Sequence, residues 1–142
     1  MKGDAFWTVD NDGTEVAMCC LNAQLRDYTR FGLLYLNDGE RDGEQVVPAE
    51  WVEESTTPQP PHEEPGGSSE SFGAFEYGYK WWIPDGSDHE FLAVGVWGQY
   101  VYVDTDAEVV IAKTSTDERF QENDDEVVEL FREITDTVSE GT

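Results

Sequence analysis

The stretch "GVWGQYVYVDTDAEVVIAKTS", residues 95–115, holds two runs of β-branched and aromatic residues separated by Thr105 and Asp106. Runs of this composition between turn residues predict strands of an antiparallel sheet. The segments "EYGYKWWIP" (residues 76–84) and "HEFLAVGVW" (residues 89–97) have the same character. We therefore expect three or four strands between residues 76 and 115.

Two glycines, Gly95 and Gly98, interrupt what would otherwise be one strand from Phe91 to Val103. A glycine inside a strand pattern marks a bend, or a place where another backbone or a ligand comes close. From these residues alone, a plain β-turn between two short strands and an edge that faces a ligand are equal alternatives.

A helix is predicted to follow Asn22, whose side chain can cap it, and to end at Asn37-Asp38-Gly39. Arg26, Asp27 and Arg30 are expected to face away from the core. The apolar positions of this helix recur at helical spacing: Leu21, Leu25, Tyr28, Gly32 and Leu36.

Further elements are expected on both sides of this helix. Asn11-Asp12-Gly13 predicts the turn of a hairpin, and Pro48 predicts the first residue of a short helix that packs Trp51 and Val52. Residues 57–72 are rich in Pro, Gly, Ser and Glu and predict a loop, which is too short to divide residues 1–142 into two domains.

The chain is expected to close with an amphipathic helix laid on the sheet. Asn123 and Glu126 have the spacing of a capping box at its start. Its apolar stripe is predicted to comprise Val127, Leu130, Phe131, Ile134 and Val138. An antiparallel sheet with flanking helices and a C-terminal helix is an α+β fold.

The charge is extreme, with 32 acidic residues against eight basic ones and a formal net charge of −24. Such self-repulsion weakens a compact state unless salt screens it, and the Debye length falls to about 3 Å at 1 M salt. The carboxylates are spread along the whole chain, which favours adaptation to high salt over an acidic mimic of nucleic acid or a cation buffer. No basic patch is available for phosphates and no apolar run approaches the ~18 residues of a membrane span, so neither nucleic acid nor membrane is an expected partner.

Neither the cysteines nor the histidines indicate a metal site. Cys19 and Cys20 are sequence neighbours, which rarely reach disulfide geometry, so both are expected to be reduced, small and buried. His62 and His89 lack cysteine or acidic partners at ligand spacing and are expected in a loop and a turn at the surface. We therefore expect no metal and no cofactor.

Three segments in this order resemble the C-terminal portion of the serine β-lactamase and penicillin-binding-protein superfamily. They are "GTEVAMCCLNAQLRDYTRFGLLYLNDGERDGEQVVPAEWV" (residues 13–52), "YGYKWW" (residues 77–82) and "FLAVGVWGQYVYVDTDAEVVIAKTS" (residues 91–115). The branch looks like the class C-related hydrolases that include 6-aminohexanoate-dimer hydrolase, and the resemblance covers nearly all of residues 3–115. It implies the C-terminal part of a β-lactamase/transpeptidase-like fold.

The resemblance also implies site residues. In the family, a Ser-x-x-Lys serine attacks an amide or ester carbonyl, and a Lys-Thr-Gly motif lies on a strand that lines the cleft. That motif falls here on Ala93-Val94-Gly95, without the lysine, which argues against a strict β-lactamase. By the same carry-over, the backbone N–H of Val96 is an oxyanion-hole donor, and Trp97 and Gln99 lie at the rim of the cleft. A Trp97 that packs in the core is an equal alternative.

No serine in residues 1–142 is followed three positions later by lysine. In the family, a Tyr-x-Asn or similar motif supplies proton transfer. Tyr35-Leu36-Asn37 spells this motif, but it falls at a helix end that the family uses for packing. Mainly structural roles are expected for Tyr77, Tyr79, Trp81 and Trp82. We therefore expect the C-terminal fragment of a cytoplasmic serine hydrolase, inactive alone, whose parent acts on a small amide or ester. The alternatives are a non-catalytic binding or accessory module of a halophile and an acidic interaction protein. The fragment interpretation also predicts self-association through an exposed sheet edge.

Overall fold

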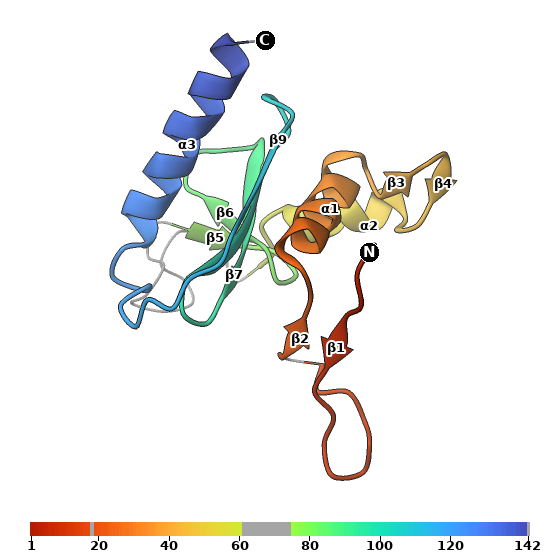
Figure 1. Cartoon of the computed structure of the whole chain (residues 1–142). Coiled ribbons are helices and arrows are strands. Elements are labelled where there is room, and N and C mark those ends of the chain that lie inside the picture. Colours follow the sequence, from red (N-terminus) through yellow and green to blue (C-terminus); the bar gives the residue numbers. More distant parts are fainter. Residues whose placement is uncertain (18, 61–74, 142) are drawn as a thin grey trace.

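The computed structural model describes residues 1–17, 19–60 and 75–141. It confirms an α+β architecture, in which one antiparallel sheet lies between helices (Figure 1). The helices are α1 (Leu25–Leu36), α2 (Ala49–Thr56) and α3 (Asp124–Glu140). The strands are β1 (Phe6–Trp7), β2 (Leu21–Asn22), β3 (Glu40–Arg41), β4 (Glu44–Gln45), β5 (Phe75–Tyr77), β6 (Trp82–Pro84), β7 (Glu90–Gly95), β8 (Gln99–Asp104) and β9 (Val109–Lys113).

The main sheet has the order β5-β6-β7-β8-β9, with every neighbouring pair antiparallel. The predicted segments from residue 76 onward all contribute to it. The first of them forms two strands instead of one, because the chain turns at residues 78–80, where Lys80 has a φ of +75°. The β7–β8 pairing runs without interruption from Glu90 opposite Asp104 to Gly95 opposite Gln99.

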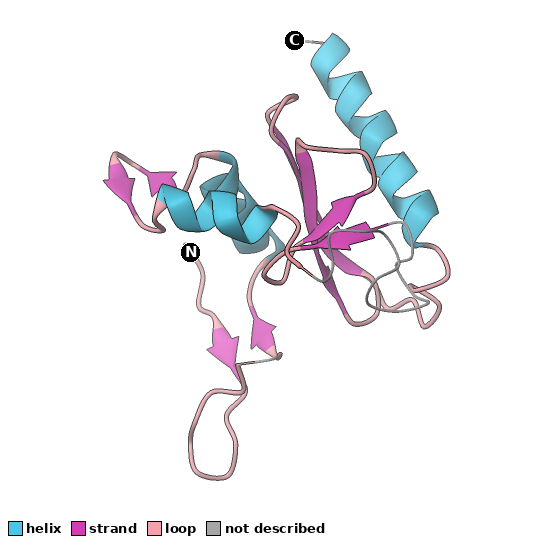
Figure 2. Ribbon diagram, turned by 180° about the vertical axis from the view of Figure 1, so that it is seen from behind, coloured by secondary structure: helices cyan, strands magenta, loops and turns pink. Residues whose placement is uncertain are grey.

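Helices α1 and α3 cover opposite faces of this sheet (Figures 1 and 2). Side chains of a strand point alternately to its two faces, so β8 contributes to two cores. Tyr100 and Tyr102 contact Phe131 of α3, with ring centroids 5.7 and 5.3 Å apart. Val101 and Val103 face α1, where they lie beside Gly32. The sheet is therefore buried on both sides near its centre.

Gly32 allows α1 to lie directly on the sheet. A Cβ atom at this position would come within 2.5 Å of a Val110 methyl group and 2.9 Å of a Val101 methyl group. Real Cβ atoms do not approach other atoms that closely. The predicted apolar stripe of this helix therefore includes a glycine because the helix backbone packs against β8 and β9.

The start of α1 differs from the prediction in two ways. Asn22 belongs to β2, and the N-cap is Gln24, which makes no side-chain capping bond. Asp27 was expected in solvent but is fully buried, because its carboxylate accepts hydrogen bonds from the backbone N–H groups of Lys2 (2.7 Å) and Gly3 (3.0 Å). Arg30 donates a further bond at 2.7 Å. This buried carboxylate ties the N-terminal segment to α1.

The rotation of α3 is also corrected. Asn123 does not form the predicted capping box, because its side-chain amide donates to Asp117 instead (3.1 Å). Phe131 is buried as predicted, whereas Leu130, Ile134 and Val138 are exposed. The helix contacts the sheet through a neighbouring face, made of Asp124, Val128, Phe131 and Thr135.

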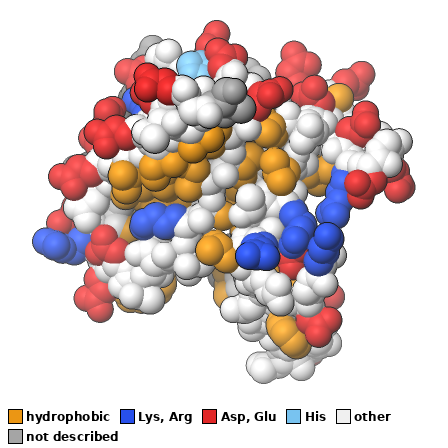
Figure 3. All heavy atoms as spheres, turned by 45° about the horizontal axis from the view of Figure 1, so that its top comes forward, with side chains coloured by type: hydrophobic (Ala, Val, Ile, Leu, Met, Phe, Trp, Pro, Cys, Tyr) orange, Lys and Arg blue, Asp and Glu red, His pale blue; other side chains and the backbone are white. Residues whose placement is uncertain are grey.

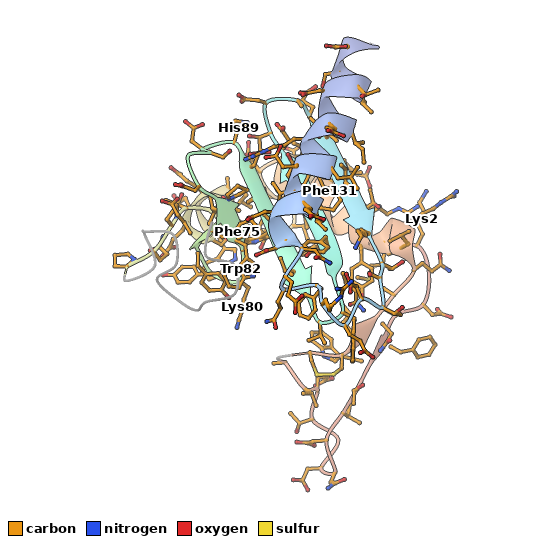
Figure 4. All side chains as sticks on the ribbon, turned by 90° about the vertical axis from the view of Figure 1, so that its left-hand side faces the viewer. Lys2, Phe75, Lys80, Trp82, His89 and Phe131 are labelled. Carbon is orange, nitrogen blue, oxygen red and sulfur yellow. A yellow bond between two sulfur atoms is a disulfide. The ribbon has the colours of Figure 1, made fainter. Side chains whose placement is uncertain are left out.

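The prediction for the two cysteines is wrong. Cys19 and Cys20 form a disulfide, and both residues are exposed. Cys20 has a φ of +76°, and this turn brings the two neighbouring sulfur atoms together. The pair lies in the loop that joins the short strands β1 and β2 (Figure 4).

The remaining elements agree in outline with the sequence. Gly13, with a φ of +85°, lies in the predicted turn between the Val9–Glu15 bridge residues. Pro48 is the N-cap of α2 instead of its first residue, and Val52 is buried while Trp51 stays exposed and stacks on Tyr79. Most of the predicted loop at 57–72 lies outside the described residues.

Within the described part of the chain, none of the helices has the length and apolar character needed to cross a membrane.

Candidate functional site

The site begins at the turn that joins β7 to β8. The N–H of Gly98 donates to the carbonyl of Gly95 at 3.1 Å, which closes a β-turn over residues 95–98. Trp97 has a φ of +72°, a left-handed conformation that costs a non-glycine residue roughly 1–2 kcal/mol. Gly98 shares this conformation, with a φ of +75°. This turn conformation favours glycine at position 98, because glycine adopts a positive φ without steric cost.

Hydrogen bonds from the last residue of β9 and from the segment after it fix the turn in place. The N–H of Asp117 donates to the carbonyl of Trp97 at 3.1 Å, and the Nζ of Lys113 donates to the carbonyl of Gly98 at 3.1 Å. Val96 lies at the tip with its residue 66% exposed. Its N–H donates to no acceptor within the described part of the chain. An anchored turn thus carries a backbone donor that the rest of the sheet does not use.

A cavity of about 280 Å³ lies beside this turn, between α1 and the end of the β7–β8 hairpin. Helix α1 and the segment before it supply one wall, and the strands supply the other. The lining residues are Met1, Leu21, Leu25, Tyr28, Phe31, Ala93, Val94, Gly95, Gln99, Tyr100, Val101, Lys113 and Thr114. Most of this lining is apolar, as is usual for small-molecule sites.

Gly95 lies against the side chain of Gln99. A Cβ atom on Gly95 would be 3.1 Å from Oε1 and 3.3 Å from Cβ of Gln99. Contacts this short require the neighbouring atom to give way by a few tenths of an ångström. The absence of a side chain at Gly95 therefore leaves room for the Gln99 amide group at the wall of the cavity.

The electrostatics of the cavity differ from those of the whole chain. Lys113 has the one charged side chain among the described residues that line it, although the chain carries 32 acidic residues. The Lys113 ammonium lies 5.2 Å from the ring centroid of Tyr100, a cation–π distance. Burial, together with the carboxylates of Asp124 and Asp117, raises the pKa of Tyr100 to about 12. Tyr100 therefore stays a neutral phenol at ordinary pH.

A second cluster of ionisable groups lies at the opposite end of β7. Ligand atoms of His89, Glu90 and Asp104 lie within 4.8 Å of one another. Both oxygens of Glu90 are already occupied, since Arg132 donates to them at 2.7–3.2 Å and the Tyr102 hydroxyl donates to one of them. A metal ion would have to displace the Arg132 guanidinium. We therefore describe this cluster as an ion-pair network that joins α3 to the sheet.

Burial and hydrogen bonding act in opposite directions on this network. Burial alone disfavours the charged form of Glu90, but the hydrogen bonds from Arg132 and Tyr102 outweigh it and lower the pKa of this carboxyl. For His89, burial opposes protonation, while Asp88 and the surrounding carboxylates raise its pKa overall. Figure 4 shows His89 at one end of the sheet and Phe131 on α3. His62 lies outside the described residues.

The structure brings together some of the residues expected at the site. Ala93, Val94, Gly95 and Gln99 all line the cavity. Val96 and Trp97 lie in the exposed turn, outside that lining.

The opposite wall was not predicted as part of a site. Leu25 and Tyr28 were assigned to the apolar stripe of α1, and their helical spacing was the one available signal. Tyr35 is buried and packs on Trp81 at 4.6 Å, in agreement with the packing role expected for Tyr35-Leu36-Asn37.

Known proteins support the resemblance. No family model matches the chain. The chain is 29% identical over 122 residues to 6-aminohexanoate-dimer hydrolase of Paenarthrobacter ureafaciens, an alignment that covers 80% of this chain and 29% of that protein. The structure of the present chain is similar to that of the "Putative 6-aminohexanoate-dimer hydrolase from Bacillus anthracis", with a TM-score of 0.79 and 29% identity. The match covers 96% of this chain and 34% of the other.

The chain thus spans about a third of the length of the proteins that it matches. Sequence identity and fold both support the resemblance across this span. The matches therefore support the expected resemblance to the C-terminal part of a β-lactamase-like serine hydrolase.

Proposed function

We propose that this chain is the part of a serine hydrolase that supplies one wall of the substrate cleft and one oxyanion-hole donor, the backbone N–H of Val96. The reaction is hydrolysis of an amide or ester through an acyl-enzyme. The attacking serine and its lysine come from polypeptide outside residues 1–142, because no serine of this chain has a lysine three positions later.

The observation that carries the proposal is the anchored turn at residues 95–98. An oxyanion donor must be fixed before negative charge develops, since a donor that reorganises during the reaction stabilises the transition state less. The carbonyls of Trp97 and Gly98 accept bonds from Asp117 and Lys113, so the turn is held from outside the hairpin. The Val96 N–H has no acceptor in the described part of the chain and is available to a substrate oxygen.

The cavity supports the same function. Its lining includes Gly95, which directly precedes Val96, and Gln99, which follows the turn. An apolar cavity of about 280 Å³ suits the hydrocarbon part of a small acyl or amine group. Gln99 and Thr114 supply hydrogen-bonding groups at its wall.

The setting of the enzyme is part of the proposal. The many acidic side chains of the chain, which lie around the edge of the face in Figure 3, are consistent with a protein adapted to high salt. A cytoplasmic location is proposed with it. The exposed Cys19–Cys20 disulfide counts against that location, because disulfides persist mainly in oxidising compartments.

The test compares two polypeptides in molar KCl. Residues 1–142 are expected neither to react with a fluorophosphonate nor to hydrolyse a p-nitrophenyl ester. A polypeptide extended through the reading frame upstream of the Met1 codon, to include a Ser-x-x-Lys serine, is expected to do both. Hydrolysis by residues 1–142 that one serine substitution abolishes would contradict the proposal, and an inactive extended polypeptide with an intact Ser-x-x-Lys would favour a non-catalytic binding module.

A further inference from the structure

The Cys19–Cys20 disulfide contributes little to stability by the usual route. A disulfide stabilises a fold mainly by closing a loop of the unfolded chain, and its contribution grows with the length of that loop. Cys19 and Cys20 are neighbours in the sequence, so the bond between them closes no loop of the chain. Its position therefore calls for a role other than holding the fold together.

Both sulfur atoms belong to residues that are open to a soluble thiol. Cys19 and Cys20 are exposed, and they are the two cysteines of residues 1–142. Thiol–disulfide exchange needs access to one sulfur atom, and exposed disulfides are in general the labile ones. Because the chain has no third cysteine with which to reshuffle, the pair has two states, the disulfide and the dithiol.

The backbone of the pair is held by hydrogen bonds from β1 and the residue after it. The N–H of Thr8 donates to the Cys20 carbonyl at 3.2 Å, and the indole N–H of Trp7 donates to the Cys19 carbonyl at 2.9 Å. Cys20 has a φ of +76°, a conformation that a residue with a side chain keeps only when its surroundings restrain it. The bond to Cys19 is one of these restraints, and reduction removes it.

The next residue connects the pair to the candidate site. Leu21 lines the cavity, and its carbonyl accepts a hydrogen bond at 2.5 Å from the hydroxyl of Tyr28 on α1, which lines the same cavity. Leu21 also pairs with Trp7 across the β1–β2 ladder. A change of backbone conformation at Cys20 therefore acts on the wall of the cavity that Leu21 and Tyr28 form.

We infer that Cys19 and Cys20 form a reversible redox site whose state sets the α1 wall of the cavity. In the reductive direction, the thiolate of an external thiol attacks one sulfur atom and breaks the S–S bond, and a second external thiolate resolves the mixed disulfide. The cysteine pair gains two electrons and two protons, and the two external thiols are oxidised to a disulfide. An external disulfide reverses the step.

A redox site also agrees with the proposed location. Disulfides of cytoplasmic proteins are usually transient, and serve catalysis or redox sensing. Only the statement that the redox state regulates substrate binding rests on the proposed function, because that function makes the cavity part of the cleft. The redox step and its effect on the cavity wall do not depend on it.

The first test is a redox titration of residues 1–142 in molar KCl with mixtures of reduced and oxidised glutathione. Thiols are counted by alkylation and mass spectrometry. We expect two thiols in excess reduced glutathione and none in excess oxidised glutathione, with circular dichroism spectra that match. A pair that stays oxidised in the native chain, or that does not re-form, would overturn the inference.

Hydrogen exchange and NMR then report the effect of reduction on the structure. Amides of residues 6–8 are expected to exchange about tenfold faster or more in the reduced chain, because they pair with residues 20–22. Residues 40–45, which hold the short β3–β4 hairpin, are the matched control and are expected not to change. The ring resonances of Tyr28 are expected to shift, whereas those of Tyr35, which packs on Trp81 from the same helix, are not.

Two variants separate the covalent bond from the backbone conformation. Cys19→Ser/Cys20→Ser is expected to match the reduced chain in either glutathione mixture. Cys19→Ser/Cys20→Gly also lacks the bond, but glycine adopts a φ of +76° without steric cost, so it is expected to match the oxidised chain. Reduction that leaves residues 6–8 and Tyr28 unchanged, equal acceleration in residues 40–45, or identical behaviour of the two variants would each overturn the inference. None of these measurements uses hydrolysis, so their failure is distinct from failure of the proposed function.

Discussion

Gly32 gives the sharpest test of how α1 is packed. In an isolated helix, Gly32→Ala would stabilise by about 1 kcal/mol, because alanine has the higher helix propensity. In this fold, the new methyl group would lie 2.5 Å from a Val110 methyl and 2.9 Å from a Val101 methyl. Ordinary contacts begin at 3.4 Å, so α1 or β9 must move by nearly 1 Å.

Overpacking of this kind costs about 1–3 kcal/mol, and two short contacts place Gly32→Ala in the upper part of that range. After the propensity gain, we expect a net loss of about 1–2 kcal/mol in the free energy of unfolding. Urea unfolding in molar KCl, followed by tryptophan fluorescence, measures it. A lower midpoint with an unchanged slope is the expected result.

The double variant Gly32→Ala/Val110→Ala separates packing from propensity. Removing the nearer methyl group relieves the shorter contact, so the cost of Gly32→Ala is expected to fall by about 1 kcal/mol in the Val110→Ala background. If Gly32→Ala instead raises the stability in the wild-type background, α1 does not lie directly on β9 and the packing argument is wrong.

Three further predictions concern individual residues. Hydrogen bonds from the Lys2 and Gly3 backbone lower the pKa of Asp27 from 3.8 to about 2, so its contribution to stability is complete above pH 3.8 and is lost as the pH falls toward 2. In unfolding curves measured between these pH values, Asp27→Asn should therefore lose less stability with falling pH than the wild type does. Trp97→Gly should raise the stability by up to about 1 kcal/mol, because glycine adopts a φ of +72° without strain; a destabilised variant in urea unfolding would count against that conformation. Thiol titration of the denatured, unreduced chain should find no free cysteine, and two after reduction by a dithiol; two thiols at the outset would exclude the disulfide.

Much of the fold follows from local sequence signals. The β-branched and aromatic runs after residue 76 do form the sheet, and α1 ends where Asn37-Asp38-Gly39 predicts. These signals work because each one acts within a few residues. Asp38 and Gly39 have φ values of +50° and +79°, conformations that asparagine, aspartate and glycine tolerate best.

The orientation of α3 could not be read in the same way. Its apolar residues form a wide stripe, and the prediction buried all of it: Val127, Leu130, Phe131, Ile134 and Val138. The structure buries one side of this stripe, because Phe131 packs on both Tyr100 and Tyr102. Arg132 then donates to Glu90, which lies 42 positions earlier in the chain. The spacing of apolar residues along a helix does not indicate an ion pair between residues so far apart in the sequence.

Burial of charged side chains was missed for a similar reason. Asp27 looks like a surface residue until the backbone of residues 2 and 3 folds back onto it. Glu90 sits in a strand pattern, where only its bonds to Arg132 and Tyr102 make burial tolerable. The sequence contains the partners but does not show that they meet.

The candidate site could be predicted on one wall only. Ala93, Val94, Gly95 and Gln99 came from the resemblance and lie together in the structure. The wall formed by α1 was assigned to the core, since an apolar residue that lines a cavity and one that fills a core have the same spacing. Leu25 and Tyr28 are of this kind.

The most direct test of the account is the kcat of the extended, Ser-x-x-Lys-containing polypeptide with Val96→Pro. Proline has no N–H, so this variant removes the proposed oxyanion donor, and loss of one such donor costs about 10²–10³ in kcat. Val96→Ala keeps the N–H and reports the loss of the side chain alone. We predict that Val96→Pro loses at least tenfold more kcat than Val96→Ala, with little change in KM and with circular dichroism spectra that match. Equal kcat values for the two variants would contradict the role of the Val96 amide.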